Sequence, residues 1–186
     1  MILNLITPLH RSGMLAKIKA SIPNEPDIKW IVVISHDREI LMKEAEQLNI
    51  PYVTCRWADI PANIHLKTNR GIKEMQPGFF QGLDDDTLFH PGSYKAFKEH
   101  GASYKLIIGE QELKAGGKRP AQKPAHCYTD GAQALIHSDL LKTVTIGSYT
   151  EHPQADCEFL LRCWEQCKPE EILIHKSPIS YYNWLR

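Results

Sequence analysis

The sequence lacks several features that would assign it to a specialised class of protein. It has five cysteines, an odd number, and none of them forms a CxxC pair, so neither a zinc ribbon nor a dithiol redox motif is indicated. Basic and acidic residues both total 22, which leaves no basic field for nucleic acid. No apolar run approaches the length of a membrane span, and the N-terminus lacks the basic start of a signal peptide. We therefore expect a cytoplasmic protein with reduced thiols, no transmembrane segment and no nucleic-acid partner.

The composition itself is that of an ordinary globular protein. The chain has 186 residues, of which 42% are hydrophobic, and this is enough for a single domain over residues 1–186. Strand-like segments at Ile2 to Ile6, Ile28 to Ile34 and Pro51 to Trp57 alternate with helical patterns. This alternation predicts parallel β/α units with right-handed crossovers. The expected fold is α/β and Rossmann-like, with a central mixed, mostly parallel sheet flanked by helices.

The second half of the chain gives less regular signals. A helix is expected from Pro91 to His100, a helical patch after Gly131 through Leu141, and a strongly periodic helix from Gln154 to Cys167. A short last strand is expected from Glu171 to Ile174. The segment Lys114 to Pro124 contains two glycines, two prolines and four basic residues. It suits either a solvated loop or a basic flap over phosphates.

Three adjacent carboxylates, Asp84, Asp85 and Asp86, follow an apolar segment of strand length. Each close pair of carboxylates costs on the order of 1 kcal/mol at a partly screened surface. A bound cation would offset that repulsion, and oxygen-only ligands suit Mg²⁺ or Mn²⁺, which are commonly shared with substrate phosphates. The alternative interpretation is a solvated acidic turn. The apolar strand directly before the triplet favours a cation site, because open α/β sheets bind ligands at the carboxyl ends of their strands.

Several short motifs occur in an order that matches a known family. Ile6-Thr7-Pro8 with Arg11 is similar to a "TP-x-x-R" start, and His36-Asp37 lies where an acid commonly meets the nucleobase. Asn69-Arg70 precedes the acidic triplet, which is similar to a DXD motif. Asp130-Gly131-Ala132 resembles a glycine loop near a donor sugar, and Gln154-Ala155-Asp156 resembles an "xED" helix start. The arrangement resembles the nucleotide-sugar-dependent glycosyltransferases of the GT-A fold, closest to family 2, and its opening also resembles the β-1,3-glucuronyltransferases.

The resemblance implies a metal-dependent transfer of sugar from a nucleotide sugar, of the UDP type, to an acceptor hydroxyl with inversion. The metal, Mn²⁺ or Mg²⁺, would be held by Asp84, Asp86 and His175. Asp156 would be the general base, with Glu158 as the alternative, because Ala155 replaces the glutamate usual in the motif. The implied contacts to the nucleotide sugar come from Thr7, Pro8, Arg11, Asp37, Asn69, Arg70, Asp84, Asp85 and Gly131.

Two other functions stay open at this stage. A sugar nucleotidyltransferase also uses acids and a metal, but such enzymes usually carry a glycine-rich, basic signature after the first strand. Residues 9–13 contain only one glycine. A non-catalytic module of the same fold would bind a sugar nucleotide or a partner protein without turnover. Ala155 and the short chain favour that alternative.

Overall fold

The structure is a computed structural model that describes residues 1–60, 63–125, 129–147 and 155–185. In these residues one sheet contains eight strands, in the order β3-β2-β1-β4-β7-β5-β6, with β8 paired to β5 on its other side. The strands are β1 (Ile2–Pro8), β2 (Ile28–Ser35), β3 (Tyr52–Cys55), β4 (Gly78–Gly82), β5 (Leu106–Leu113), β6 (Lys118–Arg119), β7 (Ala134–His137) and β8 (Ile172–Tyr182). The helices are α1 (Leu15–Ser21), α2 (Glu39–Gln47), α3 (Ile64–Ile72), α4 (Pro91–His100) and α5 (Ala155–Gln166).

Most neighbouring strands run parallel. β1 pairs in parallel with β2 and β4, β2 with β3, and β5 with β8. The exceptions are β7, which is antiparallel to both β4 and β5, and the short β6. A mixed, mostly parallel sheet flanked by helices agrees with the predicted α/β, Rossmann-like architecture.

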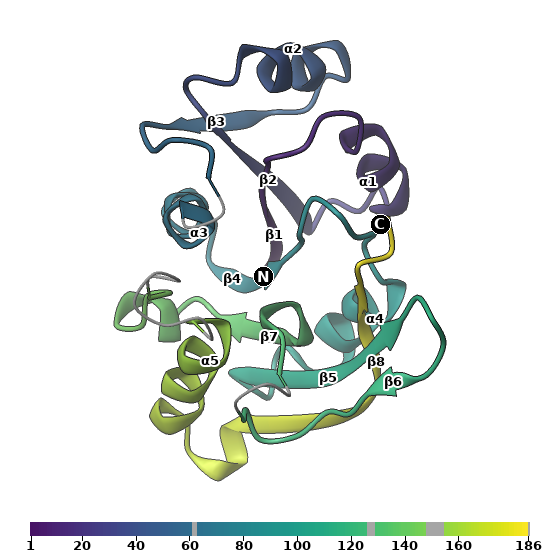
Figure 1. Cartoon of the computed structure of the whole chain (residues 1–186). Helices are drawn as coiled ribbons and strands as arrows, with labels where there is room; N and C mark the ends of the chain where they lie inside the picture. Colours follow the sequence, from purple (N-terminus) through teal and green to yellow (C-terminus); the bar gives the residue numbers. More distant parts are fainter. Residues whose placement is uncertain (61–62, 126–128, 148–154, 186) are drawn as a thin grey trace.

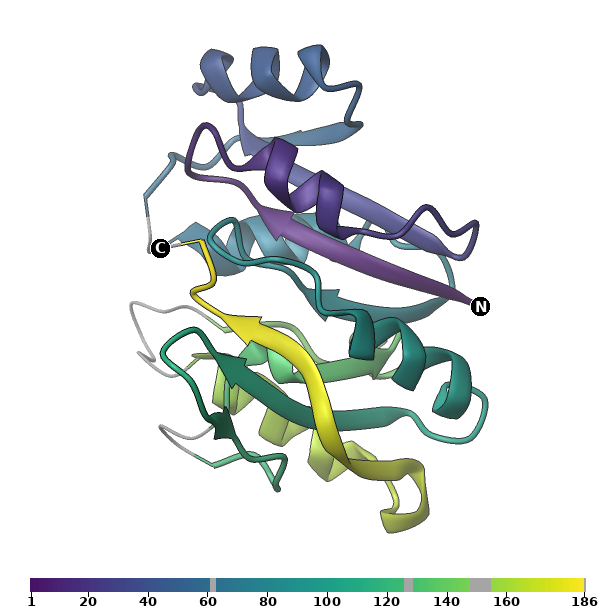
Figure 2. The same ribbon diagram turned by 90° about the vertical axis from the view of Figure 1, so that its right-hand side faces the viewer.

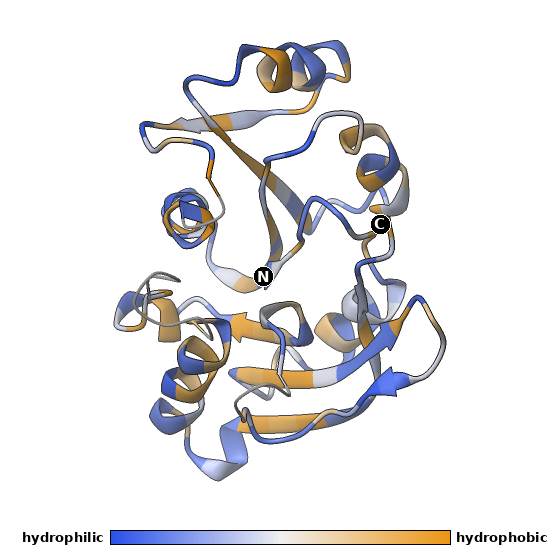
Figure 3. Ribbon diagram, viewed as in Figure 1, coloured by the Kyte–Doolittle hydropathy of each residue, from blue (hydrophilic) through white to orange (hydrophobic). Residues whose placement is uncertain are grey.

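Helices cover both faces of the sheet because side chains alternate along each strand. On one face Ile6, Val33 and Phe80 pack with residues of α5 such as Phe159, and α3 lies on the same side. On the other face Leu5 and Phe79 pack with residues of α1 and α4, while a third cluster holds α2 against β2. Figure 1 shows α3 and α5 on one side of the sheet and α1 and α4 on the other. Hydrophobic residues concentrate in β5, β7 and β8, as Figure 3 shows, whereas β6 is hydrophilic.

Two expectations for the second half are wrong. The helical patch expected after Gly131 is a 3₁₀ turn, Gly131–Gln133, followed by strand β7. Ala134, Leu135 and Ile136 are fully buried between β4 and β5, and this tertiary pairing overrides local helical preference. The last strand does not end at Ile174 but continues to Tyr182 along β5, across register shifts near Glu110. Figure 2 shows this long strand beside β5. Beyond the strand, the Leu185 N–H donates to the Asp86 carbonyl at 2.8 Å.

The acidic triplet lies at one edge of the sheet. Ile6 of β1 pairs with Gly82 of β4, so both strands end together, and β7 begins at the same edge because it runs the opposite way. The segments that follow β1 and β4, and the turn that precedes β7, therefore meet there. In the described residues no helix is long and apolar enough to span a membrane.

Candidate active site

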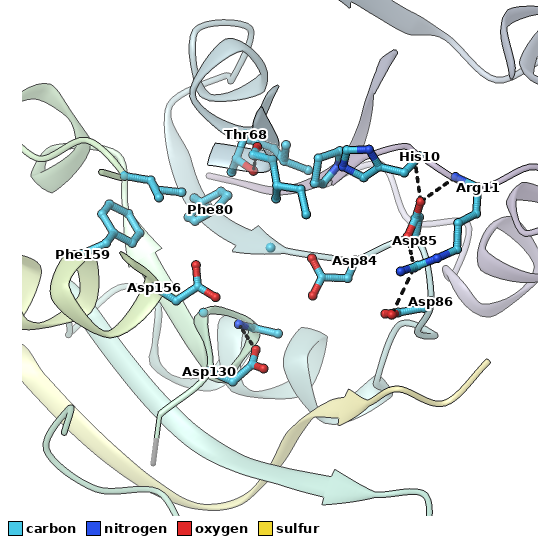
Figure 4. A pocket seen from close by; sticks show the side chains of 17 residues that line it. His10, Arg11, Thr68, Phe80, Asp84, Asp85, Asp86, Asp130, Asp156 and Phe159 are labelled. Carbon is cyan, nitrogen blue, oxygen red and sulfur yellow. Dashed lines mark hydrogen bonds and ion pairs between the residues drawn. The ribbon is translucent and has the colours of Figure 1, made fainter. Parts of the chain in front are cut away.

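A cavity of about 190 Å³ opens at this edge of the sheet. Five carboxylates and Arg11 line one part of it, and apolar side chains with Thr68 line the other (Figure 4). The acidic residues come from the turn after β4, the turn before β7 and the first turn of α5: Asp84, Asp85, Asp86, Asp130 and Asp156. The sequence placed four of these five in the site, and the structure brings them together although Asp84 and Asp156 are 72 residues apart in the chain.

Asp84 and Asp156 face one another across the cavity. In Figure 4 their carboxylates point toward each other from the end of β4 and the start of α5. The carboxylate of Asp84 makes no hydrogen bond or ion pair with the described part of the chain. Asp84 is thus the member of the acidic triplet whose carboxylate is available to a ligand.

Electrostatics distinguish Asp84 from its neighbours. Burial within the pocket raises the pKa of Asp84 well above its ordinary value, and the negative charges of Asp130 and Asp156 raise it further. Because the Asp84 side chain is nevertheless open to solvent, repulsion among the carboxylates is the better-supported cause. A cation bound beside Asp84 would relieve this repulsion.

Asp85 and Asp86 are held by Arg11. The Asp85 side chain is buried and accepts hydrogen bonds from the backbone N–H groups of His10, at 2.6 Å, and Arg11, at 2.9 Å. The Arg11 Nη1 donates to the second Asp85 oxygen at 2.5 Å and lies 3.1 Å from an oxygen of Asp86. Asp85 therefore fixes the loop after β1 against the acidic turn. This differs from the expectation that Asp85 contacts the nucleotide sugar, because both its oxygens are already engaged.

The glycine loop places Asp156. Asp130 caps the 3₁₀ turn by accepting a hydrogen bond from the Ala132 N–H at 2.9 Å. A Cβ atom built on Gly131 would lie 3.3 Å from the Asp156 Cγ and 3.5 Å from its oxygens. The absence of a side chain at Gly131 thus allows the Asp156 carboxylate to rest against the loop. The sequence predicted Gly131 and Asp156 but not Asp130. An aspartate directly before a turn is a favoured capping residue, and this was the signal for Asp130.

The apolar part of the cavity is formed by Phe80, Phe159 and Ile146, with Ile64 and Thr68 of α3. The rings of Phe80 and Phe159 meet edge to face, with centroids 6.3 Å apart. Asn69, expected to bind the donor, instead hydrogen-bonds both backbone groups of Ile146, at 2.9 and 3.2 Å. Asn69 therefore holds Ile146, which lines the cavity.

A buried charge cluster that the sequence did not predict adjoins the cavity. Lys67 is fully buried, and its ammonium donates to the Leu9 carbonyl at 2.8 Å and to Asp59 at 2.5 Å. The Asp59 carboxylate also contacts the His10 Nδ1 and, at 3.2 Å, Arg38. Burial and the charge of Lys67 lower the pKa of His10. Burial raises the pKa of Asp59, but its hydrogen bonds and charge interactions with Lys67 and His10 together outweigh burial and lower the pKa below its ordinary value.

Other predicted residues lie outside the cavity lining. The Thr7 hydroxyl accepts a hydrogen bond from Trp30 at 3.0 Å, whereas Pro8 does line the cavity. Asp37 is exposed, and Arg70 of α3 pairs with Glu74, which follows the helix. Glu158, the alternative base, does not line the cavity.

The expectation for His175 needs correction. His175 lies within β8, beside Gly109, and its ring packs against His100 of α4 with centroids 5.4 Å apart. Burial and the charge of His100 lower its pKa. His175 is not among the residues that line the cavity, because β8 continues for seven residues beyond it before reaching the acidic turn.

The residues fit a divalent cation only in part. Among the described residues, no group of three or more His, Cys, Asp or Glu side chains is arranged to hold a metal ion. Asp84 carries an available carboxylate, and Asp86 lies beside it on the same turn. Mg²⁺ and Mn²⁺ are often held by one or two carboxylates with water and substrate phosphates. The set therefore suits a cation that arrives together with a phosphorylated ligand.

Comparison with known proteins supports the fold. No protein-family model matches the chain, and no curated protein does. Among solved structures, S. aureus TarS 1-349 in complex with UDP-GlcNAc matches with a TM-score of 0.70 and 17% identity, over 98% of this chain and 59% of that one. Glucosyl-3-phosphoglycerate synthase from Mycobacterium tuberculosis, in complex with phosphoglyceric acid, matches with a TM-score of 0.66 and 12% identity, over 97% and 70%.

A third solved structure differs in coverage. The 4-diphosphocytidyl-2C-methyl-D-erythritol synthase from Anaerococcus prevotii matches with a TM-score of 0.58 and 14% identity, over 94% of this chain and 86% of that one. By contrast, the chain spans about 60% of the length of the TarS 1-349 structures. At these identities the likeness establishes the fold.

Proposed function

We propose that the protein transfers a sugar from a nucleoside diphosphate sugar, of the UDP type, to an acceptor hydroxyl with inversion. The observation that carries this proposal is the pair Asp84 and Asp156, which face each other across a cavity that is otherwise partly apolar. The likeness to TarS, whose structure contains UDP-GlcNAc, supports the choice of donor.

Each residue has a distinct part in the proposed reaction. The bond between the anomeric carbon and the diphosphate oxygen breaks while the acceptor oxygen bonds to that carbon. The acceptor's proton passes to a carboxylate oxygen of Asp156, which acts as the general base. Arg11, beside the acidic turn, places its positive charge where the leaving diphosphate would lie. Asp84 and Asp86 would hold a Mn²⁺ or Mg²⁺ ion, which supplies Lewis-acid stabilisation of the diphosphate charge.

Calorimetric titration of UDP tests donor binding. Wild-type protein should bind UDP with Mn²⁺ and lose most of its affinity in EDTA, and Asp84→Ala should bind weakly in both conditions. Glu158→Gln removes an acid of α5 that lies outside the cavity lining; it is the control for loss of a carboxylate and should behave as wild type. Equal UDP affinity with Mn²⁺ and with EDTA would remove the metal from the proposal.

The base is tested by turnover of UDP-GlcNAc, with water or a hydroxyl compound as acceptor. Asp156→Asn should lower the rate by about 10²–10⁴, the usual contribution of general-base catalysis, while UDP affinity stays near wild type. Binding of UDP without any turnover by wild type, over a broad range of acceptors, would favour a non-catalytic module.

A nucleotidyltransferase is the second candidate, favoured by the high coverage of the diphosphocytidyl synthase structure. One contact argues against it. The backbone N–H groups of His10 and Arg11 already donate to Asp85, so they are not available to a triphosphate at the loop after β1. Release of pyrophosphate from CTP or UTP with a sugar phosphate would favour this candidate, and we expect none.

A further inference from the structure

Arg119 lies next to Asp130, a residue of the cavity lining, and two other side chains hold it in place. Its Nη1 donates to the Gln111 Oε1 at 2.7 Å, and Gln111 is almost fully buried. Its guanidinium stacks over the ring of Tyr182, 4.7 Å from the centroid. The next residue is also held, because buried Gln133 donates to the Pro120 carbonyl at 3.3 Å. Ordering an arginine side chain costs up to about 2 kcal/mol of rotamer entropy, so this fixation suggests a purpose.

Neutralising Asp130 does not account for Arg119. The two side chains approach to 3.5 Å through one nitrogen, a long contact, whereas the shorter bond of Arg119 goes to the neutral Gln111. Partly exposed ion pairs of this kind are worth roughly 0–1 kcal/mol. In the described part of the chain, all polar contacts of Arg119 go through Nη1. The remaining donors of its five-donor fork are left for another group.

Arg119 is also connected to the proposed base by contiguous contacts. The Asp156 carboxylate rests against Gly131, the next residue is Asp130, and Asp130 meets Arg119. Because Gly131 has no side chain, none stands between Asp156 and Arg119 at this position of the loop. A molecule whose hydroxyl reaches Asp156 would therefore extend over the glycine loop toward Arg119.

We propose that Arg119, supported by Tyr182, binds a negatively charged group of the acceptor, so that the acceptor is a hydroxyl compound carrying a phosphate or carboxylate. The inference rests on the proposed function. Five carboxylates line the cavity, and they would repel such an acceptor unless a cation received its charge. Arginine suits this role because its planar fork donates two parallel hydrogen bonds to a phosphate or carboxylate. Tyr182 is 37% exposed, so solvent reaches the residue on which the guanidinium stacks.

The test compares charged and neutral probes of similar shape. Glycerol 3-phosphate is titrated against glycerol, and D-glucuronate against D-glucose, by NMR with Mg²⁺, with and without saturating UDP. Arg119→Met is compared with Lys118→Met, which removes the neighbouring charge of β6 that pairs with Glu110. Wild type and Lys118→Met should bind at least one charged probe about tenfold more tightly than its neutral counterpart. Arg119→Met should lose this preference while its UDP affinity is unchanged.

Arg119→Lys guards against a folding defect, because it keeps the charge and should retain part of the preference. Thermal unfolding of every variant is measured alongside. Equal binding of charged and neutral probes by wild type, or a preference that survives in Arg119→Met, overturns the proposal. If UDP fails to bind but an Arg119-dependent preference is present, the anion site stands and sugar transfer is wrong. If UDP binds but charged probes bind no more tightly than neutral ones, the anion site is wrong and the proposed sugar transfer stands.

Discussion

Removing the Asp85 carboxylate should destabilise the protein, although removing its neighbour Asp84 should not. Asp85 accepts two backbone hydrogen bonds from the loop after β1 and a third from Arg11. The Asp85→Ala variant leaves both backbone donors without this acceptor beneath a folded loop. Asp84→Ala removes a carboxylate that has no hydrogen bond to the described residues and that is repelled by Asp130 and Asp156.

The size of the effect follows from these contacts. Hydrogen bonds to charged groups contribute about 1.5–3 kcal/mol each. The Arg11 bond contributes least, because its side chain is 42% exposed and retains Asp86 as a partner. The two backbone bonds, taken at the lower end, give a loss of about 3 kcal/mol for Asp85→Ala. In a chain of this length that corresponds to a fall in melting temperature of about 6–12 °C.

Urea unfolding followed by tryptophan fluorescence measures the change, with thermal unfolding as a second probe. Asp85→Asn provides a graded comparison, because its amide oxygen still accepts from the loop while the charge is lost. About half the loss is expected for it. An Asp85→Ala variant within about 1 kcal/mol of wild type would refute the role of Asp85 as a clamp, given that hydrogen bonds of this kind rarely contribute less. Equal destabilisation by Asp84→Ala would refute the distinction between the two residues.

Three further predictions concern neighbouring groups. Asp84→Asn, measured in EDTA, should be more stable than wild type at neutral pH. The difference in stability should shrink as pH falls, because an acid with a raised folded-state pKa costs stability only while it is ionised. A difference that stays unchanged down to acid pH would contradict this. Wild type should lose stability as pH falls below 6.5, because His10 takes up a proton in the unfolded state but not in the folded state, where its pKa is lowered. The His10→Asn variant should lose less stability over the same pH range, and denaturant midpoints measured across pH would show this. His175→Ala should leave Mn²⁺-dependent UDP binding unchanged in calorimetry, and a large loss of affinity would restore it as a ligand.

Sequence patterns predicted the elements that depend on local signals. The strands and helices of the first half alternate clearly, and the apolar segment before the acidic triplet is the buried strand β4. Asp156 was expected from the resemblance of Gln154-Ala155-Asp156 to the family's helix start, and the structure places it in the cavity lining, in the first turn of α5. The strands and helices need only the residues next to them, so a single sequence contains that information.

Features that depend on distant partners could not be predicted in this way. Whether Asp85 binds a ligand or the backbone depends on the loop at His10, 75 residues earlier in the chain. His175 was misplaced because β8 continues past it only through pairing with β5. The cluster of Asp59 and Lys67 gives no periodic signal, since its members are buried by contacts between loops and a helix.

The distribution of countercharges within the cavity indicates which carboxylate awaits a ligand. Arg11 offsets Asp85 and Asp86, and Arg119 approaches Asp130, so each of these three acids has a positive side chain beside it. Asp84 has no such partner within the described residues, and the resulting repulsion raises its pKa. A fold that stabilises nearby carboxylates yet leaves this one opposed to Asp156 retains a cost that folding alone does not require. Perturbed groups of this kind concentrate at functional sites. The missing positive charge at Asp84 is therefore best supplied by a ligand, which is why the proposed cation and donor diphosphate are placed there.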